Sequence, residues 1–119
     1  MPEYKRYDIA SYVVWLQRAS RDFGGMLQSP VTVMATIGCH PSDTTDFRRL
    51  RYVFIAGDNL PADRIRERPR GKDVFVFRPF SSFPYHLDVL RNEKPIAVRL
   101  DMATVDCMLG TAREAVGEG

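Results

Sequence analysis

Two short runs of the chain carry an apolar side chain at every position. They cover positions 52–55 (YVFI) and 74–77 (VFVF). Successive side chains of a β-strand point to opposite faces, so a strand with no polar position is buried on both faces. We therefore expect strands over 49–56 and 73–78 at the centre of a sheet that is covered on both sides.

The N-terminal third has the spacing of an amphipathic helix over 8–23. Asp8 is a suitable N-cap, and Gly24-Gly25 supplies a left-handed stop. One helix covers one face of a sheet, so a second cover is needed, and we expect another subunit to provide it. The apolar positions of the predicted helix are Ile9, Tyr12, Val13, Leu16, Ala19 and Phe23. The large aromatic side chains that one helix is too small to cover are Trp15, Tyr52, Phe75 and Phe77.

The remaining segments complete an antiparallel sheet. Positions 31–37 and 95–100 alternate apolar and polar residues, which is typical of half-buried strands. The segment 60–72 is irregular, and Pro61 can begin a short helix there, which Pro69 and Gly71 would end. Residues 87–91 are either the first arm of a hairpin or, with Phe83, Leu87 and Leu90, a helix face, and 102–109 fit a helix or a strand.

These patterns predict a single α+β domain over 1–119. One long N-terminal helix packs on a curved, mainly antiparallel sheet of four to six strands, and 111–119 form a frayed tail. Hydrophobic residues make up 45% and charged residues 27% of the chain, which excludes a disordered or collagen-like protein. No apolar run reaches the roughly 18 residues of a membrane span. We expect a cytoplasmic domain with no membrane partner, whose Cys39 and Cys107 are reduced and buried.

Basic residues are concentrated in one segment. The net charge is only +2, but eight of the seventeen Lys and Arg residues lie within 48–73. Five of them, from 64 to 72, are spaced by two. In an extended chain this spacing puts their side chains on one side, where they could bind a carboxylate or phosphates. Nucleic acid is the less favoured partner because the overall charge is nearly balanced. The candidate anion-binding row is Arg64, Arg66, Arg68, Arg70 and Lys72.

An aromatic, proline-rich corner follows the second apolar run. Apolar walls with a few polar groups are typical of ligand pockets, so this corner is a candidate ligand site. The alternative is a small enzyme in which His86 acts with a nearby acid. The candidate ligand-binding residues are Arg78, Phe80, Phe83, Tyr85, His86 and Asp88.

No metal or cofactor is expected. Cys39, His40, His86 and Cys107 lack the close ligand pairs of a zinc site. The sequence therefore favours a non-enzymatic, homo-oligomeric binding module for a small apolar or anionic ligand. An enzyme using His86, or an anion or nucleic-acid binder using the basic row, is the alternative.

Overall fold

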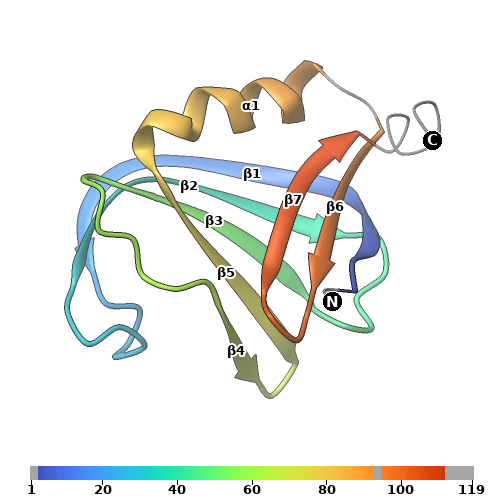
Figure 1. Ribbon diagram of the computed structural model, residues 1–119, viewed down its shortest axis with the longest axis horizontal. Helices are drawn as coiled ribbons and strands as arrows, with labels where there is room; N and C mark the ends of the chain where they lie inside the picture. The colour runs from blue at the N-terminus through green and yellow to red at the C-terminus, as the bar shows by residue number, and fades with distance from the viewer. Residues whose placement is uncertain (1–2, 93–94, 112–119) are drawn as a thin grey trace.

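The chain folds into one seven-stranded mixed sheet in the order β4-β5-β3-β2-β1-β6-β7 (Figure 1). The structure is a computed structural model that describes residues 3–92 and 95–111. Among these residues only β3 and β5 pair in parallel, and the other neighbouring strands are antiparallel. The strands are β1 (Lys5–Arg21), β2 (Val31–Pro41), β3 (Arg49–Ile55), β4 (Arg64–Arg68), β5 (Gly71–Pro79), β6 (Ile96–Asp101) and β7 (Asp106–Thr111).

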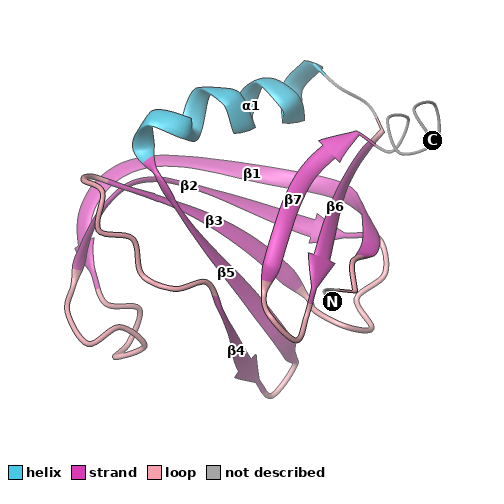
Figure 2. Cartoon of the chain, viewed as in Figure 1, coloured by secondary structure: helices cyan, strands magenta, loops and turns pink. Residues whose placement is uncertain are grey.

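The predicted α+β fold with a long N-terminal helix is wrong. The described residues are mostly sheet, with seven strands rather than four to six, and the one α-helix among them is short and lies late in the chain (Figure 2). A 3-10 turn, η1 (Phe80–Ser82), and this helix, α1 (Phe83–Asn92), connect β5 to β6. The segment predicted to be helical over 8–23 lies mainly in β1, which pairs with β2 from Ile9 to Arg21.

Two β-bulges explain why β1 has a helical pattern. β1 carries an extra residue relative to β2 between Ile9 and Ser11, and again between Leu16 and Ala19. The first bulge shifts the inward positions from Ile9 to Tyr12 and Val14, and all three pack on the same core. Steps of two and three residues between inward positions match the period of a helix nearly as well as that of a strand.

Several local predictions are confirmed and others are corrected. The strands expected over 31–37, 49–56, 73–78 and 95–100 correspond to β2, β3, β5 and β6. The helix expected from Pro61 is absent from the described residues, where β4 forms instead. The open alternatives resolve to a helix over 83–92 and a strand from Asp106. Of the predicted frayed tail, 112–119 lie outside the described residues.

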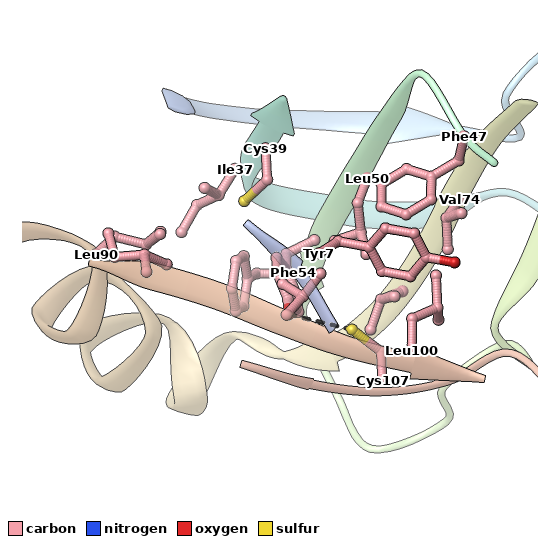
Figure 3. Packing of buried hydrophobic residues seen from close by; sticks show 14 of the residues in the cluster. Tyr7, Ile37, Cys39, Phe47, Leu50, Phe54, Val74, Leu90, Leu100 and Cys107 are labelled. Atoms are coloured by element: carbon pink, nitrogen blue, oxygen red, sulfur yellow. Dashed lines mark hydrogen bonds between the residues drawn. The ribbon is translucent and has the colours of Figure 1, made fainter. Parts of the chain in front are cut away.

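The larger core fills the concave, inner face of the sheet. Side chains from the strands meet Phe83 and Leu90 of α1 there, and Leu100 and Cys107 of the β6–β7 hairpin close it (Figure 3). Tyr52 Oη and Cys107 Sγ hydrogen-bond across this core at 3.4 Å. On the inner face, the strands that are apolar on both faces are therefore covered by a short helix and a hairpin.

The outer face of the same strands is covered by the loop between β1 and β2. Phe23 packs edge-on against Phe75 and Phe77, with ring centroids 5.5 and 6.1 Å apart. Leu27 is buried in the same outer cluster. The second cover predicted to come from another subunit is thus provided within the chain for Phe75 and Phe77, while Trp15 stays 65% exposed.

A third bulge divides the apolar positions of β2 between the two cores. Val33 pairs with Ile55 and Ala35 with Phe54, so Met34 is an extra residue in β2. Val33 joins the outer cluster, whereas Ala35 and Ile37 join the inner core. The uniform alternation of 31–37 in the sequence had placed these residues on one face.

Among the described residues, no helix is both long enough and apolar enough to cross a membrane.

Candidate functional site: an arginine-lined groove on the outer sheet face

The predicted aromatic pocket is divided between the core and the surface. Phe83 is buried in the inner core, with Phe80 stacked on it at 5.7 Å. Tyr85 is 74% exposed, and Asp88 accepts a hydrogen bond from Asn92 at the surface of α1. Arg78 turns away to pair with Asp63, 3.1 Å between Nη1 and Oδ2.

His86 has the contacts of a packing residue. Its ring lies 4.9 Å from that of Tyr52 and 5.2 Å from that of Phe54, and Nδ1 donates to the carbonyl oxygen of Ser82 at 3.0 Å. Burial lowers the pKa of His86 below its ordinary value. These contacts fix the His86 ring against the core.

The basic row separates into structural and surface members. Arg64, Arg66 and Arg68 alternate along β4, and the pairing of Arg64 with Phe75 puts them on the outer face. Arg68 and Arg70 are exposed, while Lys72 lies 3.8 Å from Glu67. The row therefore does not present five free cations to one ligand.

Two members of the row hold the covering loop. Arg64 Nη1 donates to the carbonyl of Met26 at 3.1 Å, and Arg66 Nη1 donates to that of Phe23 at 2.8 Å. Gly24 adopts φ +68°, and a Cβ there would lie 3.3 Å from Arg66 Nη2. The glycine thus lets the guanidinium approach the loop backbone.

The two cysteines are free thiols inside the inner core. Burial raises the pKa of Cys39 to about 12 and that of Cys107 to about 11. His40 points the other way, into the outer groove described next. Within 3–92 and 95–111, no three His, Cys, Asp or Glu side chains cluster as metal ligands do.

A groove of about 750 Å³ lies on the outer face. Val13 and Trp15 of β1 line one side, and Arg49 and Arg51 of β3 line the other. Gly38 of β2 lies between Val13 and Arg51 in the cross-strand register, so no β2 side chain stands between these two residues. The covering loop closes one end with Phe23 and Gly24.

The basic side of the groove is built around one buried carboxylate. Asp73 is 2% exposed, and the guanidinium groups of Arg48 and Arg49 each lie 3.4 Å from its oxygens. Arg49 Nε is buried without a hydrogen-bond partner among the described residues. Asp73 thus pairs with both Arg48 and Arg49, and the Nε–H of Arg49 has no acceptor within the described residues.

Arg51 adds a further cation to this site. Its guanidinium lies 5.4 Å from the centre of the Phe75 ring, and no hydrogen-bond partner for it is found in the described part of the chain. Burial, followed by the positive charge of Arg49, lowers the pKa of Arg51. Repulsion between half-buried guanidinium groups would be relieved by an anion in the groove.

Sequence reasoning missed this site because β1 was assigned to a helix. Once the segment is a strand, Ser11, Val13 and Trp15 share one face by simple alternation. Arg49 and Arg51 likewise alternate with the buried Leu50 and Tyr52. Period two within each strand is the signal that could have identified these residues.

No protein family, curated protein or solved structure matches the chain. The site is therefore interpreted from its own chemistry.

Proposed function

We propose that this protein is a binding module for a small organic anion, taken up in the groove on the outer face of the sheet. The observation that carries the proposal is that the guanidinium groups of Arg49 and Arg51 both line the groove, while Asp73 is the one acidic partner found for them in the described part of the chain. Guanidinium groups bind carboxylates and phosphates through paired, charge-assisted hydrogen bonds. An oxyanion is the ligand group that this side of the groove fits.

The opposite side of the groove supports an apolar or aromatic body on the same ligand. Trp15 is 65% exposed and Val13 is 43% exposed, although each borders the groove. An indole face provides a large apolar contact surface, and a planar group can stack on it. A volume of about 750 Å³ lies in the range of small-molecule sites.

Single-stranded nucleic acid is the second candidate ligand, because an exposed aromatic side chain beside arginines also suits a base and its phosphate. The groove is closed at one end by the covering loop, and the net charge of the chain is only +2. A polymer needs a path that continues in both directions, so a small ligand is favoured.

The tryptophan provides the test, because Trp15 is the only one in the chain. Phenyl phosphate, benzoate and inorganic phosphate are titrated while the fluorescence of Trp15 is recorded. We expect saturable quenching or a spectral shift with the two aromatic anions, and weaker binding of inorganic phosphate. An oligothymidylate titration at low and physiological salt tests the polymer: tighter binding with increasing length and a steep salt dependence would favour nucleic acid.

Variants identify the residues that bind the anion. Arg51→Gln should weaken phenyl phosphate binding by about 10- to 100-fold, the equivalent of one lost charge-assisted interaction. Arg70→Gln, at an exposed turn position, is the matched control and should bind as the parent does. Equal affinity of the two variants, or no response of Trp15 to any of the anions, would contradict the proposal.

A filling substitution tests the groove without changing its charge. A Cβ at Gly38 would meet only Arg49 Cδ, at 3.8 Å, which is an ordinary contact. Gly38→Leu should therefore fold, place its side chain between Val13 and Arg51, and abolish phenyl phosphate binding.

A further inference from the structure

Within residues 3–92 and 95–111, one edge of β1 has no strand partner over most of its length. β1 pairs with β6 only from Lys5 to Asp8, although it continues to Arg21. From Ile9 onward, no strand in the described residues lies on that side of β1. Backbone N–H and C=O groups along such an edge are satisfied by water or by another extended chain.

The middle of this edge lacks the features that protect monomeric sheets. Between the two bulges the sequence runs from Ser11 to Leu16 with no charge and no proline. Val13, Trp15 and Leu16 are 43%, 65% and 69% exposed. Soluble proteins usually place lysine, proline or a covering element on a free strand edge. An uncharged apolar edge is therefore expected to have a partner.

The edge is complementary to itself. We propose that a second copy of this chain pairs with it, antiparallel, about a twofold axis through Val14 and perpendicular to the sheet. In this register Trp15 lies opposite the partner's Val13, and Leu16 lies opposite the partner's Tyr12. Each pair is apolar, and aromatic residues opposite β-branched ones are favourable cross-strand neighbours. A twofold contact also closes the edge in a dimer rather than extending it into a fibre.

This dimer does not depend on ligand binding. Leu16 pairs with Ala35, on the inner side of the sheet, and does not line the groove. Trp15 and Val13 belong to both surfaces, so the dimer would place two grooves on one continuous outer face. The two proposals can therefore fail separately.

Sedimentation velocity over a concentration series tests the dimer. We expect a dimer for the parent protein and a monomer for Leu16→Lys, because a lysine opposite the partner's Tyr12 places a charge in the apolar interface and opposes edge pairing. Leu60→Lys, another exposed leucine, is the matched control and should remain dimeric. Leu16→Lys should still respond to phenyl phosphate, and Arg51→Gln should still dimerise. A monomeric parent protein, or a dimer that Leu16→Lys leaves intact, would overturn the proposal.

Cross-linking tests the register. Directly opposed residues of antiparallel strands have Cα atoms about 4.5–5.5 Å apart, within the range that a disulfide spans. Val14→Cys should therefore give a covalent dimer under mild oxidation, whereas Leu60→Cys should not, and the buried Cys39 and Cys107 do not compete. Folding of both variants is checked by circular dichroism. Covalent dimer from Leu60→Cys but not from Val14→Cys would contradict this pairing.

Discussion

His86 shows how one residue can suggest chemistry in a sequence and serve packing in the structure. It follows aromatic residues and precedes Asp88, a pattern that fits a pocket, yet its ring packs on Tyr52 and Phe54. Which way a side chain points depends on whether 83–91 is helix or strand, and the periodicity of this segment allowed both. The helix directs His86 to the core and Tyr85 to solvent.

The burial of His86 predicts a pH-dependent stability. Its pKa is lowered in the folded state, so the unfolded chain binds a proton at a higher pH than the folded chain does. The stabilising contribution is fully present above the ordinary histidine pKa and is lost as the pH falls through the lowered folded value. Urea unfolding at pH 7.5 and 5.5 should show this loss, and His86→Gln should reduce the difference. An equal pH dependence of the variant would contradict the assigned contacts.

The buried thiols make a second prediction at this scale. Burial raises the pKa of Cys39 to about 12 and that of Cys107 to about 11, so both are protonated at pH 8. Only the thiolate reacts with alkylating reagents. Mass spectrometry should therefore find no alkylation of the native protein by iodoacetamide at pH 8, and double alkylation in urea. Rapid reaction of a native thiol would contradict its burial.

At the scale of elements, strands could be predicted where their pattern lies within a short run of the sequence. β-Branched alternation identified β2 and β6, and unbroken apolar runs identified β3 and β5 as two-sided central strands. The prediction for β1 was wrong because its two bulges change which positions face the core within one strand. No local sequence rule marks where such an extra residue is inserted. The covering loop was not predicted for another reason. Phe23 and Phe75 are far apart in the sequence, and only the assembled fold brings them together.

The covering loop gives the prediction at this scale. Phe23→Ala removes the ring that packs on Phe75 and Phe77, and it should lower the free energy of unfolding by about 2–3 kcal/mol, as for other large-to-small changes in a packed cluster. Hydrogen exchange of the loop amides should accelerate as well. Tyr85→Ala, at a 74% exposed position, is the control and should change stability little. Equal stability of the two variants would show that the loop is not a cover.

At the scale of the whole molecule, the sheet uses its two faces differently. The inner face holds the core under α1 and the β6–β7 hairpin, and the described residues cover the outer face only in part, with the loop between β1 and β2. The uncovered part of the outer face carries Arg49 and Arg51 beside Trp15. The sequence favoured a small apolar or anionic ligand, but it located that ligand at the aromatic corner and the basic row. The groove is formed by strands that are distant in the chain and adjacent in the sheet.

The most direct test of the binding proposal is a two-dimensional 1H–15N NMR titration with phenyl phosphate, followed at backbone amides and at arginine Nε–Hε groups. The buried Arg49 Nε–H should give its own protected signal. We predict that this signal, the amide of Gly38 and the indole of Trp15 shift together and saturate at one ligand concentration. Shifts confined to α1 or to the exposed turn at Arg70, or a spectrum unchanged at saturating phenyl phosphate, would contradict the proposed site.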